Sequence, residues 1–548
     1  MKGRFSLSAV MALIGISLLV AATASGGNSG PNAAEKQTVK KGGTYRALGT
    51  SDFDHLDPAL SYFTHSWNWQ GATQLRMYYY PYVKGAASER IAPMAATGLP
   101  RVSNGGKTYT ITIKKGFKFS DGQNVTAANF KRAFDRARNA KLQSPASSFL
   151  DDLARYKTIG THGLQLTLKR VAPDFLARIT MPFFSAVPLS FPLDTEVDKG
   201  PIVSAGPYFV QEWNKKTSAL AVRNPNWKNN VEPFKSLGFA NNVDRITYSG
   251  IGGDLATHRL QCERNEADIC GFPTTQAKEL ADKYGINKQR FKVDQDLLIW
   301  RIDMNNEQPL FKNNPALRKA VLHALDRRFM TAQHGFLAGK RTDQFLPYGM
   351  HGFKEWNIYS LKGPNYAKAK ALATPAALRG GKAVFYAFNR AQGPPVSQSV
   401  QFNLKQIGLD VEIKLFDRVV QNTKAATRGE AFDFTHEGWH ADYPDPSNFI
   451  NVLLDGRRLQ AENNVNTSYY SGSGLKDFTK KLDAAYAASG ATRLNLYAAL
   501  DRDIMAQGAA NAPYISGTTR RFFGPDVGCY VANGQVGTVL VNICKTGG

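Results

Sequence analysis

The sequence predicts an α/β protein built as more than one lobe, and three observations support that prediction. The chain has 548 residues, more than a single hydrophobic core normally serves, so two or three lobes are expected. Hydrophobic residues make up 43% of the sequence and aromatic residues 11%, a composition typical of well-packed globular proteins. Segments with strand periodicity alternate with segments of helical spacing along the chain, which is the pattern of α/β architecture.

The N-terminal segment has the organisation of an export signal. It begins with the basic residues Lys2 and Arg4 and continues with an apolar stretch over residues 10–22. A small-x-small cleavage signal, Ala22-Thr23-Ala24, ends it. We expect residues 1–24 to be a signal peptide, and residues 25–41, rich in Gly, Ser, Asn and Lys, to be a flexible linker. No cysteine follows the apolar stretch, so the sequence predicts no lipid attachment site.

The clearest local architecture lies between residues 101 and 138. Asn104-Gly105-Gly106 predicts a hairpin turn, followed by an alternating strand over residues 108–114. The next helix begins after Thr126 as its N-cap and buries one face, formed by Phe130, Ala133, Phe134 and Ala137. Further strands are expected at residues 42–48 and 164–168, and a helix over residues 67–80.

Residues 432–449 predict a strand that leads into a stiff turn. The apolar residues Phe432 and Phe434 alternate with polar ones, Gly438 permits a close backbone approach, and two prolines stiffen the exit. Large rings at Trp439 and Tyr443 flank Asp442, an arrangement that suits an extended ligand with a cationic end. On these residues alone, a core strand followed by a surface turn is the favoured interpretation.

Four cysteines fall into two pairs that are local in sequence. An exported protein meets an oxidising environment, so two short-loop disulfides are the simplest interpretation, with the pairing left open. The spacings do not match a zinc site. The four residues are Cys262, Cys270, Cys529 and Cys544.

The net charge of +24 is spread along the chain and is accompanied by no nucleic-acid-binding motif, so no nucleic-acid partner is predicted. A hydrolase is the main enzymatic alternative. The chain contains no Gly-x-Ser-x-Gly elbow, no His-Glu-x-x-His helix and no nucleotide-binding glycine loop. We therefore expect no enzymatic activity, no catalytic residues and no cofactor.

A series of short blocks, in order, resembles the extracytoplasmic solute-binding proteins of peptide-importing ABC transporters, the dipeptide and oligopeptide class of the peptide/nickel-binding superfamily. The similarity runs from about residue 42 to about residue 525, and its strength lies in the order and spacing of blocks that are individually unspecific. One block departs from the family pattern, since Asn265-Glu266 replaces a glycine before Ala267-Asp268. The main blocks are Gly42-Gly43-Thr44, Leu56-Asp57-Pro58-Ala59, Thr108-Tyr109-Thr110, Phe117 to Gly122, Gly206-Pro207-Tyr208, Arg223-Asn224-Pro225, Asp303-Met304-Asn305, Gly438 to Pro446 and Pro513-Tyr514.

The resemblance implies a two-lobed, periplasmic-binding-protein-like α/β clamp of type II with an extra small domain, in which the first lobe is discontinuous. Lobe I would comprise residues 42–80, 200–295 and 508–548. The extra domain would comprise residues 81–199, and lobe II residues 296–507. The lobes would hinge closed over a ligand.

The resemblance also implies a site. In the family's peptide binders, the aspartate of the Gly-Trp-x-x-Asp block pairs with the α-amino group of the ligand, and Asp442 occupies that position. A carboxylate partner compensates for the desolvation penalty of a buried ammonium group. A merely structural Asp442, capping the turn before Pro444, is the alternative. The residues expected to contact ligand are Asp442, Trp439, Gly438, His440, Ala441 and Tyr443.

Some members of the superfamily import nickel, which invites a metal site at His436 and His440. The strand-like pattern and Gly438 argue against a helical pair of histidines here, so no metal site is predicted. We expect an exported monomer, peripheral to the membrane, in the periplasm or at the cell surface, which binds a small peptide and contacts permease subunits. Binding of a nickel complex, an opine or a sugar in the same fold is the alternative.

Overall fold

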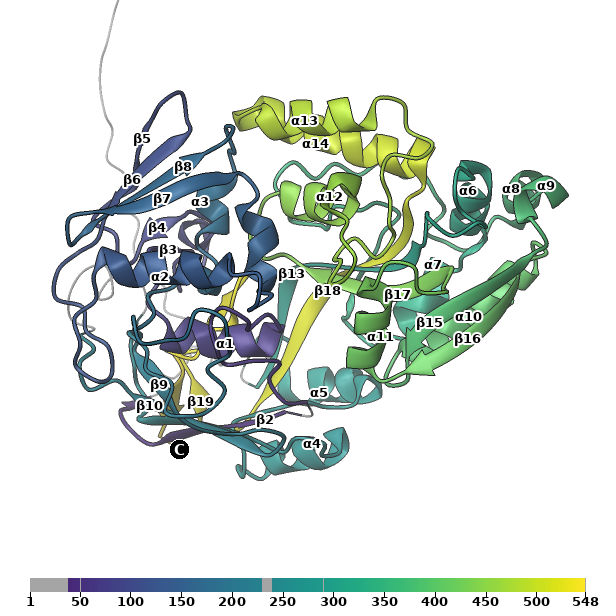
Figure 1. The fold of residues 1–548 in the computed structure, drawn as a ribbon. Helices are drawn as coiled ribbons and strands as arrows, with labels where there is room; N and C mark the ends of the chain where they lie inside the picture. The colour runs from purple at the N-terminus through teal and green to yellow at the C-terminus, as the bar shows by residue number, and fades with distance from the viewer. Residues whose placement is uncertain (1–37, 50, 229–238, 289, 548) are drawn as a thin grey trace, which may run out of the picture. The chain divides into compact units, whose positions relative to one another are not determined.

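In the computed structural model, which describes residues 38–49, 51–228, 239–288 and 290–547, an eleven-stranded sheet is the central element (Figure 1). Its strands follow the order β16-β15-β17-β13-β18-β12-β2-β11-β10-β9, and β14 pairs with β18. The proposed signal peptide and most of the linker lie outside the described residues. The bounds are β2 Thr44–Leu48, β9 Tyr208–Asn214, β10 Ser218–Arg223, β11 Arg245–Ser249, β12 Ile269–Cys270, β13 Phe291–Met304, β14 Gly339–Arg341, β15 Lys382–Phe388, β16 Asp410–Phe416, β17 Phe434–His440 and β18 Asn511–Phe523.

The two longest strands, β13 and β18, join the two ends of this sheet. They are antiparallel, and their register shifts twice along β13, first between Gln295 and Leu298 and again between Trp300 and Arg301, which marks bulges or irregularities in the ladder; the first shift divides the strand. Before the shift, β13 pairs with the part of β18 that extends toward β12; after it, β13 also pairs with β17. A bulge bends a strand and increases its twist, so the two ends of the sheet meet at a bend.

Helices cover the β15–β17 end of the sheet. β15 and β16 are parallel strands connected through α10. Parallel neighbours need a long crossover connection, which is usually a helix. α11 also packs against β15 and β16, and α13 and α14 form a helical pair (Figure 1). The bounds are α6 Pro315–Ala324, α7 Arg327–Ala332, α8 Tyr366–Leu372, α9 Pro375–Leu378, α10 Gly393–Lys405, α11 Arg418–Ala426, α12 Ser447–Leu454, α13 Phe478–Ala487 and α14 Gly490–Asp503.

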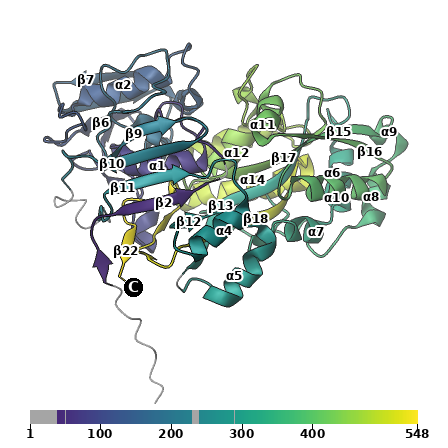
Figure 2. The ribbon, with the colours of Figure 1, turned by 90° about the horizontal axis from the view of Figure 1, so that it is seen from below.

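At the opposite end, β2, β11, β10 and β9 lie side by side, with α4 and α5 near β12 and β18 (Figure 2). α4 ends near Asn265, which has a φ of 61°. Asparagine tolerates this left-handed conformation better than most residues, which explains how the chain lacks the glycine of the family pattern here. The bounds are α1 Thr64–Thr73, α4 Leu255–Glu263 and α5 Ala277–Tyr284.

Residues 101–178 form a separate four-stranded antiparallel sheet, β5-β6-β8-β7, with α2 packed on β7 and β8. The predicted hairpin turn is confirmed, because Asn104, Gly105 and Gly106 all have positive φ. Thr126 is the N-cap of α2 as predicted, and its N–H donates to Asn129 Oδ1 at 2.8 Å. The bounds are β3 Tyr78–Tyr79, β4 Ala92–Pro93, β5 Arg101–Ser103, β6 Thr108–Thr112, α2 Ala127–Ala137, β7 Leu153–Ile159, β8 Gly163–Leu168 and α3 Phe175–Arg178.

The C-terminal segment folds back onto the start of the described chain. β1 pairs with β22, so residues predicted as the end of the linker, Val39 and Lys40, are in a strand. The structure contains two disulfides, Cys262–Cys270 and Cys529–Cys544, which join the sequence-local pairs. The bounds are β1 Val39–Lys40, β19 Val527–Gly528, β20 Ala532–Asn533, β21 Gly537–Thr538 and β22 Cys544–Thr546.

One sequence prediction in the core is wrong: the helix expected over residues 67–80 ends at Thr73, and the chain continues extended through β3. Leu75, Met77, Tyr78 and Tyr79 are all fully buried. A segment buried on every side has no amphipathic period to mark it as helix or strand, and a run of tyrosines favours extended backbone.

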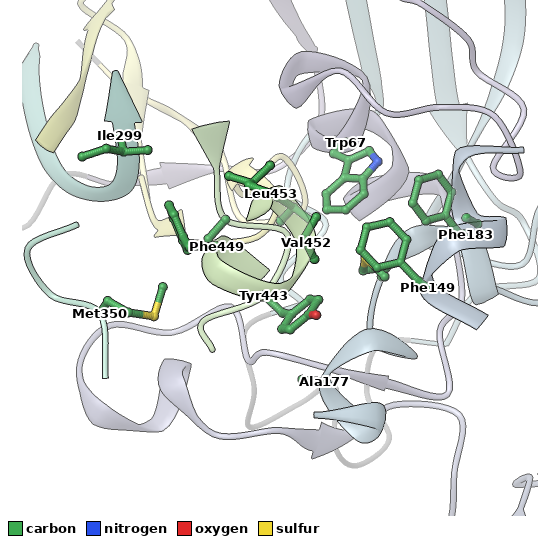
Figure 3. Packing of buried hydrophobic residues seen from close by; sticks show 14 of the residues in the cluster. Trp67, Phe149, Ala177, Phe183, Ile299, Met350, Tyr443, Phe449, Val452 and Leu453 are labelled. Carbon is green, nitrogen blue, oxygen red and sulfur yellow. The ribbon is translucent and has the colours of Figure 1, made fainter. Parts of the chain in front are cut away.

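Aromatic side chains from distant segments meet in the core. Trp67 and Phe183 have ring centroids 5.6 Å apart, and Phe149 packs on Phe183 at 6.4 Å. Figure 3 shows these rings on one side of a group that continues through Val452 and Tyr443. Residues 67–183 and residues 443–453 therefore share one continuous hydrophobic core. None of the helices in the described residues is both long and apolar enough to cross a membrane.

Candidate functional site

A cavity of ≈ 1160 Å³ separates two sets of segments. One wall comes from the chain before residue 152, and the other comes from the chain after residue 300. The volume exceeds the usual range of about 300–1000 Å³ for small-molecule sites, so the cavity has room for an extended ligand. The wall segments are residues 54–63 and 139–151 on one side, and Arg301, residues 418–426, 437–439, 452 and 457–467 on the other.

Strand β17 brings the predicted Gly-Trp pair to the cavity. Gly438 and Trp439 both line it, together with Glu437. Gly438 lies opposite Trp300 in the ladder with β13, and a Cβ at Gly438 would meet the Trp300 ring at 3.0 Å. Glycine is therefore the residue that lets strand and ring approach this closely. The strand continues through Gly438 to His440, because both residues stay in the ladder with β13.

Asp442 lies directly behind this wall. It is 5% exposed, and its Oδ2 accepts hydrogen bonds from Tyr62 Oη at 3.2 Å and from Asn448 Nδ2 at 2.8 Å. Tyr62 lines the cavity from the opposite wall, and its ring meets that of Trp439 edge-on with centroids 6.5 Å apart. Asp442 is not itself among the residues that line the cavity, so Tyr62 and Trp439 separate it from the open space.

The electrostatic state of Asp442 is unusual. Burial raises the pKa of this carboxyl to about 7, although the hydrogen bonds from Asn448 and Tyr62 and the nearby His440 partly lower it. Both hydrogen-bond donors are neutral, and no ion pair to Asp442 occurs among the described residues. A buried carboxylate without a cationic partner is a group for which a ligand ammonium would be a favourable partner.

Neighbouring amides fix the position of Asp442. Asn448 Oδ1 accepts from the backbone N–H of Asp442 at 3.0 Å and from Trp439 Nε1 at 3.1 Å. Gln535 Nε2, from the C-terminal segment, donates to the carbonyl oxygen of Asp442 at 2.9 Å. Gln535 is held in turn by Arg76 Nη1, which donates to its Oε1 at 2.8 Å. The aspartate, the tryptophan and the C-terminal segment are thus connected by one set of hydrogen bonds.

The other predicted contact residues, His440, Ala441 and Tyr443, are not among the residues that line the cavity. His440 Nε2 lies 2.6 Å from Asp296 Oδ1; burial lowers the pKa of His440, but this carboxylate outweighs burial and raises it. Ala441 is buried, and Tyr443 Oη donates to Asp174 Oδ2 at 3.1 Å. Of the six predicted residues, the structure thus brings Gly438 and Trp439 to the cavity and Asp442 to its edge.

The two histidines considered for a metal have separate partners. His436 is fully buried in β17, and its Nε2 lies 2.7 Å from Tyr514 Oη. His440 is paired with Asp296, as described above. No group of three or more His, Cys, Asp or Glu side chains arranged to hold a metal ion occurs in the part of the chain that the structure describes.

Several cavity residues were not predicted from the sequence. Arg301 is a charged residue within an otherwise apolar stretch of β13, and a charge in such a stretch is a signal of a buried, paired group. Arg418 and Asn422 are four residues apart on α11, which places them on one helical face. Tyr62 and Asn464 carry no sequence signal of this kind, since they lie in irregular segments whose position depends on the rest of the fold.

One family model and several known proteins match this chain. The sequence profile of the bacterial extracellular solute-binding proteins, family 5, middle part, matches residues 90–460. Among curated proteins, the probable D,D-dipeptide-binding periplasmic protein DdpA of Escherichia coli K12 is 24% identical over 436 residues, which cover 77% of this chain and 79% of DdpA.

Three solved structures share the fold over almost the whole chain. Clavulanic acid biosynthesis oligopeptide binding protein 2 has a TM-score of 0.81 at 22% identity and covers 93% of this chain and 97% of its own. The periplasmic binding protein DppA from Helicobacter pylori, in complex with the peptide STSA, has a TM-score of 0.78 at 20% identity. The match covers 93% of this chain and 99% of the DppA chain. AgaA from A. tumefaciens R10, in complex with agropinic acid, has a TM-score of 0.77 at 19% identity. The match covers 92% of this chain and 99% of the AgaA chain. The predicted periplasmic-binding-protein-like α/β fold is confirmed.

Proposed function

Because this chain belongs to the family 5 bacterial extracellular solute-binding proteins, we propose that it captures short peptides in the cavity beside Tyr62 and Trp439. Proteins of this family bind solutes outside the cytoplasm for ABC import and are not enzymes, so this chain is an extracytoplasmic solute-binding protein. The peptide would then be handed to permease subunits of the importer. The protein would act as a monomer, peripheral to the membrane.

The observation that carries the peptide assignment is the state of Asp442. Its buried carboxyl has only neutral hydrogen-bond donors, and it lies behind the two rings that meet across the cavity. A free α-amino group would supply the missing cation, and small shifts of Tyr62 and Trp439 would bring it within reach of Oδ2. Charge-assisted hydrogen bonds of this kind are about twice as strong as neutral ones.

The arrangement of the cavity supports the division into lobes proposed from the sequence. Residues 54–63 of lobe I and residues 139–151 of the extra domain would face lobe II, which supplies the second wall. The predicted boundary at residues 295 and 296 coincides with the first register shift in β13. A bend at this point in the two strands that join the lobes is a natural place for a hinge.

A non-peptide solute is the second candidate. It is favoured by the similarity to AgaA, whose structure holds agropinic acid. At 19% identity, this similarity shows a shared fold and not a shared ligand. Mass spectrometry of the ligand that co-purifies with the native protein distinguishes the two candidates. A peptide series supports the proposal, and a single opine or other small solute overturns it.

Isothermal titration calorimetry of the Asp442→Asn variant tests the site itself. We expect peptide binding to weaken by about 1.5–3 kcal/mol, the range for a hydrogen bond to a charged group. An N-acetylated peptide should lose a similar amount against the wild-type protein, because it lacks the ammonium. Asp501→Asn is the matched control: Asp501 is also a buried carboxyl with a pKa raised by burial to about 7, but it lies outside the cavity wall. An unchanged dissociation constant for Asp442→Asn removes this residue from the site.

A further inference from the structure

The small antiparallel sheet β5-β6-β8-β7 carries positive charge without negative charge. Its strands and the turns beside them, residues 101–118 and 153–173, contain nine lysines and arginines but no aspartate or glutamate. The nine residues are Arg101, Lys107, Lys114, Lys115, Lys118, Arg155, Lys157, Lys169 and Arg170. A surface with charge of one sign creates a field that attracts partners of the opposite sign.

The two faces of this sheet have different surroundings. α2 packs on one face, where the Tyr156 ring of β7 has its centroid 5.6 Å from that of the Phe134 ring of α2 (Figure 1). Side chains alternate along a strand, so the neighbours of Tyr156, Arg155 and Lys157, project from the opposite face. Two cations of β7 therefore lie on the side of the sheet that faces away from α2.

Strand register adds a third cation to that side. Arg101 of β5 lies opposite Thr110 of β6. Thr110 lies opposite Gln165 of β8, and Gln165 lies opposite Lys157 of β7. Residues opposite one another in a ladder share a face, so Arg101 and Lys157 end one row across four strands, about 14 Å wide at about 4.8 Å per strand. We call the surface formed by Arg101, Arg155 and Lys157 the basic face.

The protein does not neutralise these three cations. Arg101, Arg155 and Lys157 are exposed, and their side chains have no ion-pair partner among the described residues. The acidic residue that precedes β7, Asp152, is buried, and its Oδ1 pairs with Arg170 Nε at 2.5 Å. The charges of the basic face are therefore available to an external anion.

Exposed apolar side chains accompany the basic face. Ile159 follows Lys157 by two residues on β7, so it lies on the same face, and it is 46% exposed. Leu99, Val102 and Val171, from the same strands and the segments that flank them, are also exposed. Cations beside apolar side chains are typical of surfaces that lie in the interface of a membrane, where the charges meet headgroups and the apolar groups meet acyl chains. A soluble anionic polymer would need only the cations.

We propose that the basic face docks the protein on a membrane surface that contains anionic phospholipids. This inference rests on the proposed function, because a protein that hands its ligand to permease subunits works at a membrane. A basic residue close to an anionic bilayer strengthens binding about fivefold, so three of them on one face contribute about a hundredfold. Ser103 and Thr108, which form the second row of the same face, add hydroxyl donors for phosphate oxygens.

Co-sedimentation of the exported protein with large unilamellar vesicles tests the docking. The vesicles contain phosphatidylcholine alone or an equal mixture of phosphatidylcholine and phosphatidylglycerol, and no peptide is present. We expect binding to the mixed vesicles only, and weaker binding as the screening length falls from about 10 Å at about 0.1 M salt to about 3 Å at about 1 M. Equal binding to both kinds of vesicle, or binding to neither, overturns the proposal. Either failure leaves peptide capture untouched, because calorimetry with peptide measures that function separately.

A triple variant locates the effect. Replacing Arg101, Arg155 and Lys157 by glutamine should lower the partition coefficient on the mixed vesicles about a hundredfold, while peptide affinity stays unchanged. Unchanged peptide affinity also shows that the variant is folded.

A second triple variant is the matched control, because it removes the same net charge from another exposed surface. It replaces three exposed lysines at or near α8 by glutamine: Lys362, Lys368 and Lys370. This control should keep most of the vesicle binding. An equal loss in both triple variants means that net charge and not the basic face binds the membrane, and it overturns the proposal.

A gain of binding provides a second test. Thr110→Lys adds a cation in the middle of the row between Arg101 and Lys157, so binding to the mixed vesicles should strengthen about fivefold. Ala371→Lys adds the same charge on α8 and should have a smaller effect. Equal effects of the two lysines contradict a localised docking face.

Inorganic polyphosphate distinguishes a membrane from an anionic polymer. Ile159→Ser removes an apolar side chain but no charge, so it should weaken binding to the mixed vesicles and leave the retention of polyphosphate unchanged. Retention of polyphosphate that is lost in the glutamine variant of the basic face, without binding to vesicles, overturns the membrane as the partner and identifies a polymeric anion in its place.

Discussion

Asp442 is a carboxyl group held where water does not solvate it, and its side-chain hydrogen-bond partners are neutral. Tyr62 and Asn448 donate hydrogen bonds to it, but neither brings a charge. The protein therefore bears a desolvation cost at this residue that a cationic ligand would relieve. Two measurable consequences follow from this desolvation cost: peptide affinity should depend on pH, and replacement of the carboxyl group should change the stability of the protein.

Peptide affinity should depend on pH around the pKa of Asp442, which burial raises to about 7 in the ligand-free protein. Only the ionised carboxylate attracts an ammonium, so below pH 7 binding must first displace a proton. The dissociation constant should therefore rise by up to about tenfold per pH unit between pH 7 and pH 5, and rise again above about pH 8, where the peptide's own α-amino group loses its proton. Calorimetry in buffers of different ionisation enthalpy measures the proton released on binding at pH 6. His440 titrates nearby, but the Asp442→Asn variant should lose the dependence below pH 7.

Replacing Asp442 by asparagine should stabilise the ligand-free protein at pH 8. The folded-state pKa lies above the unfolded value, so the folded protein loses stability as pH rises from about 4 to about 7, and the full cost is present above that range. A shift of about three units corresponds to up to about 4 kcal/mol, which the Asn448 amide, facing a new amide, would reduce. Chemical denaturation at pH 4 and pH 8 provides the measurement. If Asp442→Asn raises the free energy of unfolding equally at pH 4 and pH 8, the stabilisation does not come from removing a buried charge.

At the scale of elements, β17 and the C-terminal segment hold the site from two directions. β17 delivers Glu437, Gly438 and Trp439 to the cavity through its ladder with β13. The segment between Cys529 and Cys544 delivers Gln535 to the backbone of Asp442. The disulfide closes this segment into a loop, so its integrity bears on ligand binding as well as on stability.

Removing the Cys529–Cys544 bond with paired serine substitutions should lower stability by about 3 kcal/mol, the loop-entropy value for about 15 residues. It should also weaken peptide binding, because a more mobile loop positions Gln535 less well against Asp442. The Cys262–Cys270 bond is the control, since it also closes a short loop, with a sequence separation of 8 instead of 15, far from Asp442 in sequence. Its removal should lower stability without a comparable effect on affinity. Thermal unfolding and calorimetry on both double variants compare the two bonds.

At the scale of the whole described unit, contacts across the cavity connect segments that are hundreds of residues apart. Tyr62 reaches Asp442, and Arg458 Nη2 donates to the carbonyl oxygen of Ser148 at 2.8 Å. Outside the cavity, Tyr443 and Ser447 both donate to Asp174, at 3.1 and 2.7 Å. We expect contacts of this kind to form together when the two walls approach, which would couple the site to a closed arrangement.

Peptide binding should therefore make the protein more compact. Small-angle X-ray scattering should show a smaller radius of gyration with saturating peptide than without it, because the ligand stabilises the arrangement in which both walls contact it. Asp442→Asn at the same peptide concentration should show a smaller change, in line with its weaker binding. An identical radius in the presence and absence of bound peptide would contradict closure around the ligand.

Local architecture and family membership can be inferred from the order of amino acids. The turn at Asn104 to Gly106, the N-cap at Thr126 and the strand at Phe434 follow from short-range chemistry, since backbone preference and periodicity are properties of a few consecutive residues. Ordered motifs then led to the α/β clamp, and Asp442 with Trp439 was identified from one block of residues. The end of α1 at Thr73 was not predictable in this way, because tertiary burial on all sides removes the pattern on which such predictions depend.

The surroundings of those residues depend on the tertiary fold. Tyr62 and Gln535 lie 380 and 93 positions from Asp442, and Arg301 meets Glu437 through a strand ladder. Contacts at such separations depend on how the sheet and the C-terminal loop are assembled, and no local pattern encodes them. For the same physical reason, the raised pKa of Asp442 became visible only in the folded chain: burial and the identity of neighbours are properties of the three-dimensional packing.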